Sequence, residues 1–298
     1  MTAAKIALLE DRGVVSVNGE DAEKFLQGLI TNDMDLLGSQ SAIFAGLLSP
    51  QGKILFEFFV ARAAEGYLLD VAKAQAGALA QRLNMYKLRA KVDVRDAGAN
   101  HVMFALWGDE AVPSGETKKT VSFEDPRSSR LGRRIAAEAL IAADISPAEN
   151  ASTCGAADYH AHRIALGIPE GGKDYAFGEA FVHEALFDQL SGVSFAKGCY
   201  VGQEIVARME HRGTARRRIV RVRGAGELPG MATDVKAGDV VIGAMGSHAG
   251  DNGLAMLRLD RVIEFAVKGV GLTAGGVALT PDANDVARLM SRSQAKDP

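Results

Sequence analysis

The chain has little cysteine and no long hydrophobic run, and each shortage excludes a class of protein. Only two cysteines, Cys154 and Cys199, occur among 298 residues, which is too few for a disulfide framework. No apolar stretch approaches the roughly 18 residues that a membrane-spanning helix needs. The opening stretch MTAAKIALLEDRG lacks the basic, apolar and small-residue regions of a signal peptide. These shortages predict reduced thiols, no membrane partner and a cytoplasmic location.

Signals for several common catalytic classes are also missing. Glycine is abundant, with 33 residues, but RGAGELPG and VIGAMGSHAG have neither the spacing nor the following helix of a nucleotide-binding loop. No Gly-x-Ser-x-Gly nucleophile turn occurs. His160 and His162 are two residues apart on an expected helix, so they point in different directions and cannot chelate one ion. The sequence therefore does not favour a nicotinamide-dependent enzyme, an ATP-dependent enzyme or a serine hydrolase, and it predicts no metal site.

What is present is the composition of an ordinary globular protein, with 47% hydrophobic and 24% charged residues and a net charge of −3. A chain of this length is expected to form two or three domains. Residues 1–100 mix hairpins with helices and do not cycle as βαβα, which favours an α+β fold. A hairpin is expected at 41–62 around a Pro50–Gln51–Gly52 turn, with helices at 20–30 and 73–88.

Two further parts are expected after residue 100. Residues 101–216 form a second α+β part, in which 151–168 predicts a helix that stops before Pro169. From 217 to 298, short apolar segments alternate with glycine, which predicts a small C-terminal antiparallel β-barrel. The stretch LAMLRLDRVIEFAVKG is included among its strands. The last dozen residues are expected to form a frayed tail.

Cys199 lies in the segment KGCYVGQE, residues 197–204. Lys197 precedes it by two residues and an expected helix follows it, and both features stabilise a thiolate. Gly198 and Gly202 remove side-chain bulk on either side, so a ligand could approach closely. These observations fit an accessible, reactive thiol. The alternative is a buried cysteine that packs as a small apolar residue, which is the commoner fate of a free cysteine.

Arginine is concentrated after the cysteine motif, with Glu210 as the one acidic residue nearby. Within RIVRVRG, Arg221 and Arg223 alternate with valines, which predicts a strand with one solvated face. The cluster can be a charged edge strand or a basic rim that binds a carboxylate, a phosphate or RNA. The candidate anion-binding and partner-binding residues are Arg208, Arg212 and Arg216.

The segment KGCYVGQE, followed by ARMEHRGTARRR, resembles the signature of the YgfZ-type folate-binding proteins, which are similar in fold to the glycine cleavage T-protein, an aminomethyltransferase. GEDAEKFLQGLITNDM, QGKILFEFFV, LRAKVDV, DPRSSRLGRR and YHAHRIALGIPEGGKD resemble other family segments in the same order. The resemblance implies an α+β folate-binding region around a central hole, followed by a β-barrel. Family members act with tetrahydrofolate to assemble or maintain iron–sulfur clusters, in enzymes that include some tRNA-modifying ones.

The resemblance also implies roles for individual residues. Cys199 would be the functional thiol and Lys197 its cationic neighbour, with tetrahydrofolate or a derivative as cofactor and no stably bound metal. Tyr159 would stack on the pterin ring. The residues implied to contact folate are Tyr159, Arg12, Asn32, Glu57, Arg163, Glu184 and Gln203.

Three positions depart from the family pattern. Phe56 and Glu57 replace adjacent aspartates of the T-protein hairpin, and the longer Glu57 side chain argues against positioned aminomethyl transfer. Leu186 stands where YgfZ-type proteins usually have asparagine, so a donor and an acceptor for folate are missing. Arg12 stands where some members have tryptophan.

Three functional hypotheses follow from these observations. The first is a folate-dependent accessory protein for iron–sulfur cluster assembly or repair, with client or assembly proteins as partners. The second is a one-carbon transfer enzyme of the aminomethyltransferase type that uses Glu57. The third is an RNA-binding module built on the arginines, against which the acidic net charge and the scarcity of nearby aromatic residues argue.

Overall fold

The computed structural model describes residues 4–108, 113–114, 119–147, 151–212 and 215–294. By its internal contacts the chain divides into two units. The first unit contains residues 1–48, 55–159 and 189–201, and the second contains residues 49–54, 160–188 and 202–298. In the part of the chain that the structure describes, no helix combines the length and apolar character that a membrane span requires.

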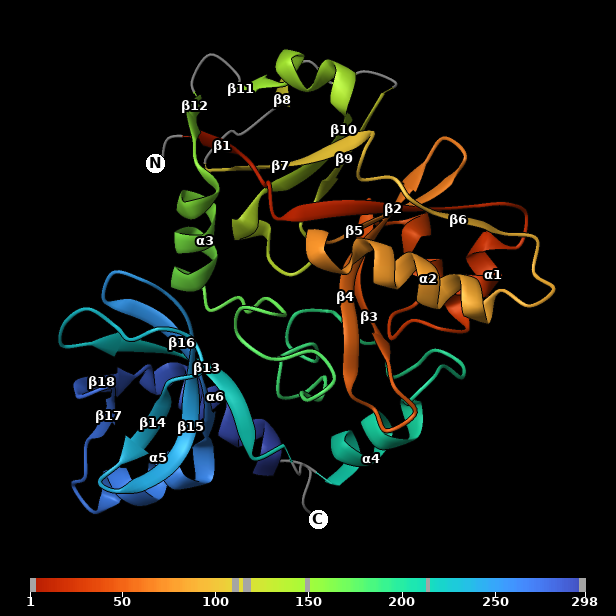
Figure 1. Cartoon of the computed structure of the whole chain (residues 1–298). Helices are drawn as coiled ribbons and strands as arrows, with labels where there is room; N and C mark the ends of the chain where they lie inside the picture. Colours follow the sequence, from red (N-terminus) through yellow and green to blue (C-terminus); the bar gives the residue numbers. More distant parts are fainter. Residues whose placement is uncertain (1–3, 109–112, 115–118, 148–150, 213–214, 295–298) are drawn as a thin grey trace. The chain divides into compact units, whose positions relative to one another are not determined.

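The first unit contains a five-stranded sheet in the order β3-β4-β5-β2-β6 (Figure 1). Its strands are β2 (Arg12–Asn18), β3 (Ala42–Leu48), β4 (Ile54–Ala63), β5 (Gly66–Ala72) and β6 (Asp93–Asp96). β5 pairs antiparallel with both β2 and β4, and β2 pairs antiparallel with β6. The strands expected around the Pro50–Gln51–Gly52 turn are therefore present as β3 and β4.

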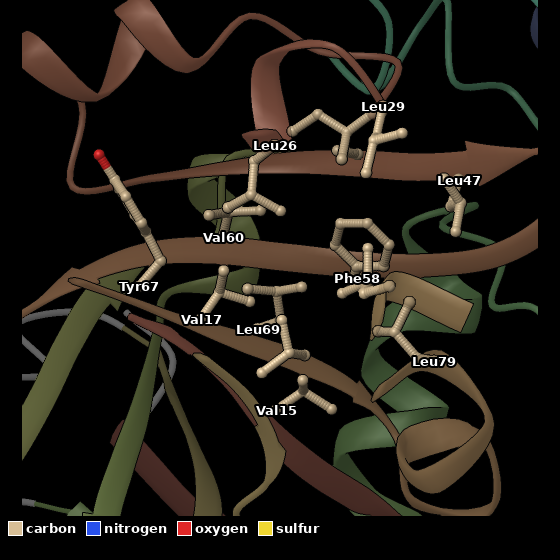
Figure 2. Packing of buried hydrophobic residues seen from close by; sticks show 14 of the residues in the cluster. Val15, Val17, Leu26, Leu29, Leu47, Phe58, Val60, Tyr67, Leu69 and Leu79 are labelled. Atoms are coloured by element: carbon tan, nitrogen blue, oxygen red, sulfur yellow. The ribbon is translucent and has the colours of Figure 1, made fainter. Parts of the chain in front are cut away.

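Two helices, α1 (Ala22–Gln27) and α2 (Ala76–Tyr86), cover one face of this sheet. Figure 2 shows Leu26 of α1 and Leu79 of α2 packed over Phe58, Val60 and strand residues such as Val15 and Leu69. Alternate residues along a strand point to opposite faces. Phe44, Phe59 and Asp70 therefore face away from this core. The opposite face carries the charged network described below.

The second sheet of this unit has the order β12-β1-β7-β10-β9. Its strands are β1 (Ala4–Leu8), β7 (His101–Trp107), β9 (Thr120–Glu124), β10 (Arg133–Glu138) and β12 (Ala151–Cys154). β12 pairs parallel with β1, and the other pairs are antiparallel. The predicted helix at 151–168 is therefore wrong in its first residues. Residues 151–154 form β12, the edge strand of this sheet, and the helix α3 spans Ala156–Ala165.

Short elements complete the first unit. Two-residue strands β8 (Pro113–Ser114) and β11 (Ser146–Pro147) pair with each other. The short 3-10 helices are η1 (Met34–Gly38), η2 (Lys73–Gln75), η3 (Ser129–Leu131) and η4 (Ala139–Asp144).

The second unit contains a closed barrel with the order β13-β16-β15-β14-β17-β18, as the glycine-punctuated pattern predicts. The strands are β13 (Arg217–Gly224), β14 (Asp234–Ala237), β15 (Val240–Ala249), β16 (Asn252–Arg258), β17 (Leu272–Ala274) and β18 (Val277–Pro281). All pairs in the barrel are antiparallel. α4 (Gln203–Arg212) precedes the barrel in the chain.

Two expectations for the C-terminal region are wrong. Residues 259–267, expected as strand, form α5 (Leu259–Val267), with Leu259 and Val262 buried at the helical spacing of three. The expected frayed tail contains α6 (Ala283–Gln294). Asp285 of α6 accepts hydrogen bonds from Arg221 of β13, at 2.9 Å from Nε, and Leu289 is buried. These tertiary contacts stabilise a helix that its composition alone does not reveal.

Candidate functional site

The predicted site residues are divided between the two units. Those in the first unit are Arg12, Asn32, Glu57, Tyr159, Lys197 and Cys199; those in the second are Arg163, Glu184, Gln203, Arg208, Arg212 and Arg216. Within the first unit they form two groups. One is a buried charged network that contains Arg12 and Tyr159. The other is the cysteine loop, which we define as residues 196–200.

The buried network joins arginines and aspartates across the first unit. Asp70 of β5 accepts from Arg12 Nε at 2.7 Å and from Arg134 Nη1 at 2.6 Å. Asp125 accepts from Arg134 Nε at 3.1 Å and from both Nε and Nη2 of Arg127. All five side chains are buried. These contacts link two carboxylates with three guanidinium groups in the interior of the first unit.

Tyr159 and Phe59 occupy the centre of this network. Tyr159 Oη accepts from Arg134 Nη2 at 2.9 Å and from Arg127 Nη2 at 3.3 Å. The guanidinium carbons of Arg134 and Arg127 lie 4.2 and 4.7 Å from the centroid of the Phe59 ring, close enough for cation–π attraction. The Phe59 ring and the Tyr159 hydroxyl oxygen therefore contact the guanidinium groups in addition to the two aspartates.

The Tyr159 ring has no open face for a pterin. Its relative exposure is 1%, and it packs against Trp107 with ring centroids 5.5 Å apart in an edge-on arrangement. Stacking on tetrahydrofolate would require this packing to rearrange. Glu57 is also buried, and because Phe56 and Phe58 belong to the core under α1 and α2, Glu57 points to the face of the network.

The network fixes the charge state of Asp125. Burial by itself raises the pKa of a carboxyl group, but the guanidinium groups of Arg127 and Arg134 outweigh it and hold the pKa of Asp125 at about 2. Removing one member would leave buried charges uncompensated. The structure thus assigns this group to the stability of the first unit.

Lys197 is buried and is occupied by backbone carbonyl groups. Its Nζ donates to the oxygens of Gln27, Ile30 and Asn32 at 2.8, 2.8 and 2.7 Å. Burial lowers the pKa of Lys197 to about 8, while the charges of Asp33 and Asp35 act to raise it. Gln27 is the last residue of α1, and Ile30 and Asn32 lie just after it in the chain. The Lys197 ammonium group therefore links the cysteine loop to the C-terminal end of α1. What the structure shows for Lys197 is a positioning role.

Cys199 itself is exposed, as an accessible thiol requires, whereas Cys154 is half-buried. The neighbouring Gly198 is open as well, since a Cβ added there would meet nothing within 4 Å. Tyr200 is buried beneath the Lys197 ammonium group, 5.3 Å from ring centroid to Nζ. The loop therefore anchors Lys197 and Tyr200 while it presents Cys199 to solvent.

Asn32 is a structural member of the same region. Its Nδ2 donates to the carbonyl oxygens of Phe44 and Ser191 at 2.8 and 2.7 Å, and its Oδ1 accepts from the Asp33 amide. The side chain is 3% exposed. These contacts use both ends of the amide group, so Asn32 holds the segment after α1 against Ser191 and strand β3.

Glu184 and Arg163 lie in the second unit and contact different partners. Glu184 accepts from Arg217 Nε at 2.7 Å and from the Phe181 amide at 3.0 Å. Arg163 is fully buried and donates to Asp174 Oδ2 at 2.8 Å and to Ser247 Oγ at 3.0 Å. Both residues support the segment between α3 and the barrel. Gln203 opens α4 and is half-buried.

The arginine cluster is neutralised more fully than the sequence indicates. Arg218 is buried and donates to Asp188 at 2.7 Å; Arg221 pairs with Asp282 and Asp285, and Arg223 pairs with Asp251. Acidic residues distant in sequence supply these partners, which the local sequence, with Glu210 as its one acidic residue, does not reveal. Arg208 and Arg216 are exposed, and the side chain of Arg212 lies outside the described residues.

Leu186 adopts a left-handed backbone conformation with φ +64° and is buried. Asparagine enters this conformation more readily than leucine does. The asparagine that the resemblance places here would therefore suit the backbone as well as a ligand.

Sequence reasoning missed four members of the buried network: Asp70, Asp125, Arg127 and Arg134. Asp70 carried a signal, because it is the one charged residue in the otherwise apolar strand GYLLDVA. Asp125, Arg127 and Arg134 belong to the segment DPRSSRLGRR, and the pairing of Arg134 with Asp70 depends on the fold.

The two sheets of the first unit and the closed barrel define a protein of the T-protein fold with a C-terminal β-barrel. Residues 4–113 match the GCVT N-terminal domain and residues 216–289 match the CAF17 C-terminal beta-barrel domain. The solved structure of glycine cleavage system aminomethyltransferase T from Bartonella henselae superposes with a TM-score of 0.73 over 96% of this chain and 86% of that chain. At 17% identity, this likeness establishes the fold alone.

The curated relatives identify the family. The mitochondrial iron–sulfur cluster assembly factor IBA57 of Mus musculus is 35% identical over 85% of this chain and 77% of its own length. The human protein of the same name is 32% identical over the same shares. The Mycosarcoma maydis homologue is 35% identical over 72% of this chain, and the match spans 56% of its length. The chain belongs to the IBA57 family of iron–sulfur cluster assembly factors.

These relatives correct one prediction and refine another. The expected cytoplasmic location is contradicted, because the relatives are named as mitochondrial proteins. The predicted T-protein fold and the link to iron–sulfur cluster assembly factors are confirmed, while the family shown is IBA57 and the YgfZ-type proteins are a distinct, related group.

Proposed function

We propose that this chain is an accessory protein for iron–sulfur cluster assembly or repair, and that Cys199 is the residue that contacts the cluster. The exposed thiol at the centre of the KGCYVGQE segment carries this proposal. Family membership supports it, since the relatives are named as iron–sulfur cluster assembly factors.

The chemistry suits a ligand that is shared with a partner. A thiolate binds iron, but a cluster usually takes four such ligands. Among the described residues no group of three or more His, Cys, Asp or Glu side chains could hold a metal ion. Cys199 would therefore supply one sulfur ligand to a cluster in transit, and an assembly or client protein would supply the others. The cluster is cargo in this scheme.

Lys197 and Tyr200 would hold Cys199 in a fixed position for this contact. The ammonium group of Lys197 and the buried ring of Tyr200 fix the backbone on both sides of Cys199. A partner would then meet a thiol held in place by its neighbours, and the entropy lost on binding would be small.

Tetrahydrofolate is the cofactor that the resemblance implies, and effects on tRNA-modifying iron–sulfur enzymes belong to the same proposal. The implied contact residues do not fit folate as they stand. Tyr159 is enclosed, both ends of the Asn32 amide are engaged, and Arg163 is fully buried among its partners. We therefore derive no step through folate. Calorimetric titration with tetrahydrofolate tests this part directly: saturable heat would support folate binding, and its absence would contradict it.

Replacement of Cys199 by alanine tests the central proposal. Cells that depend on this chain and carry Cys199→Ala should lose the activity of their iron–sulfur enzymes, while the purified variant unfolds at the same denaturant concentration as the parent protein. Cys154→Ala is the matched control, because Cys154 is the other cysteine and its thiol donates to the Ile6 carbonyl at 3.5 Å. Full activity with Cys199→Ala would refute the proposal.

A further inference from the structure

The last turn of α2 and the residues that follow it carry apolar side chains that the core does not use. The buried residues of this helix are Ala76, Leu79, Ala80 and Leu83, a helical stripe that packs on the sheet. Met85 and Leu88 lie off this stripe and are 66% and 91% exposed. Neither contributes to folding by burial.

Leu88 is also held in a backbone conformation that disfavours it. It follows the C-cap residue Lys87 and has φ +43°. Glycine or asparagine usually occupies this left-handed position after a helix, and an L-residue with a large side chain costs about 1–2 kcal/mol there. Because glycine would end the helix at lower cost, helix termination does not explain the choice of leucine.

Basic residues flank these two side chains in the sequence. Residues 81–92, QRLNMYKLRAKV, contain four basic residues and no acidic residue. Lys91 forms an ion pair with Glu20. Arg82, Lys87 and Arg89 form no ion pair with any residue that the structure describes. This part of the surface thus combines two exposed apolar side chains with nearby lysine and arginine side chains.

We propose that Met85, Leu88, Arg82, Lys87 and Arg89, here named the α2 patch, form a docking surface for an acidic protein that offers a small apolar recess. The leucine and the methionine would fill the recess, and the three cations would meet carboxylates around it. Complementary charge of this kind steers association and selects the partner. The proposal holds whether or not Cys199 contacts a cluster.

Protein is a better occupant than a membrane or RNA. An interfacial helix binds lipid with an apolar face along its length, whereas the apolar face of α2 is buried on the sheet and two side chains remain outside. Single-stranded nucleic acid is bound by exposed aromatic rings beside cations, and the one aromatic residue here, Tyr86, is half-buried against the core.

The chain offers a matched control in the barrel. Val267 ends α5, is 84% exposed, and is followed by Lys268. Lys268 donates to Glu264 at 2.7 Å, so its charge is neutralised. The Val267 site therefore has the exposure of Leu88 and an adjacent lysine, but it lacks both the unpaired cations and the left-handed backbone.

A photoreactive residue tests the proposal in the full chain. Benzoylphenylalanine at position 88, expressed in cells, should cross-link an acidic protein that the same group at position 267 does not. The purified partner is then titrated against the parent chain and variants. We expect Leu88→Asp and the pair Lys87→Glu with Arg89→Glu to weaken binding by on the order of tenfold or more. Val267→Asp should leave it unchanged, and salt should weaken binding to the parent chain.

Leu88→Gly separates docking from folding. This change removes the side chain and relieves the left-handed backbone, so the melting temperature should hold or rise while binding falls. Equal cross-linking at 88 and 267, or a partner whose affinity ignores Leu88→Asp and Leu88→Gly, would overturn the proposal. Binding only to vesicles of phosphatidylserine and phosphatidylcholine, or only to tRNA, would overturn it as well.

Discussion

The buried network around Tyr159 and the cysteine loop both contain residues for which the family resemblance implies a function, but their surroundings differ. In the network, guanidinium, carboxylate and phenol groups bind one another, and the side chains are nearly inaccessible. In the cysteine loop, Lys197 is buried among carbonyls and Cys199 two residues later is exposed. A polar group whose partners lie within the protein contributes mainly to stability, while an exposed thiol remains available to a partner protein.

Asp125→Asn should have the largest effect on stability. It would leave Arg127 and Arg134 short of a buried counterion, and breaking such a pair costs about 3–5 kcal/mol. Denaturant unfolding of the purified variant measures this loss. The control is Asp251→Asn, whose partner Arg223 is 73% exposed at the side chain; exposed pairs contribute about 1 kcal/mol or less. Equal effects of the two variants would show that burial does not distinguish these pairs.

Lys197→Met should destabilise the protein less. Three carbonyl groups would lose a charged donor, and hydrogen bonds to charged groups contribute about 1.5–3 kcal/mol. We expect faster amide hydrogen exchange at residues 27–32 and 196–200, with Lys236→Met on the exposed surface of β14 as control. Unchanged exchange at both segments would mean that Lys197 does not position the cysteine loop.

Acid should weaken the network in a defined pH range. The pKa of Asp125 lies at about 2 in the folded protein, below its ordinary value of 3.8. The folded state thus binds the proton more weakly, and stability falls as the pH drops from about 5 towards 2. A difference of roughly 1.8 units corresponds to about 2 kcal/mol. Unfolding free energies measured from pH 6 to pH 2.5 should fall less steeply in Asp125→Asn than in the parent protein.

Substitution of Cys199 should have the smallest effect on stability, although Cys199 should be the more reactive of the two thiols. Cys199→Ser replaces an exposed thiol with a hydroxyl group and should change the unfolding free energy by about 0.5 kcal/mol or less. Burial raises the pKa of Cys154 above that of an ordinary thiol, and the charge of Asp158 raises it further. Less of Cys154 is therefore present as thiolate than for a thiol with an ordinary pKa. Iodoacetamide should therefore modify Cys199 faster by on the order of tenfold. Equal rates of modification would remove the contrast between the two thiols.

The sequence predicted correctly those strands and helices whose characteristic residue pattern is contained within a few consecutive residues. The glycine spacing after residue 217 predicted the barrel strands, because each short apolar segment and the turn after it lie within a few consecutive residues. α5 was missed because LAMLRLDRVIEFAVKG joins a strand to a helix without a glycine or proline between them. α6 was missed because its stability comes from contacts with β13, such as the pair of Arg221 with Asp285.

Sequence by itself determined the two-part α+β and barrel plan, the scarcity of cysteine, and the position of Cys199 in a segment typical of one family. Only the tertiary structure decided that Tyr159 is enclosed by arginines, that Lys197 binds carbonyls, and that Leu88 points into solvent. The physical reason is that burial and pairing depend on residues tens to more than a hundred positions apart, as with Arg134 and Asp70 or Lys197 and Ile30. Such partners come together only when the sheets have formed.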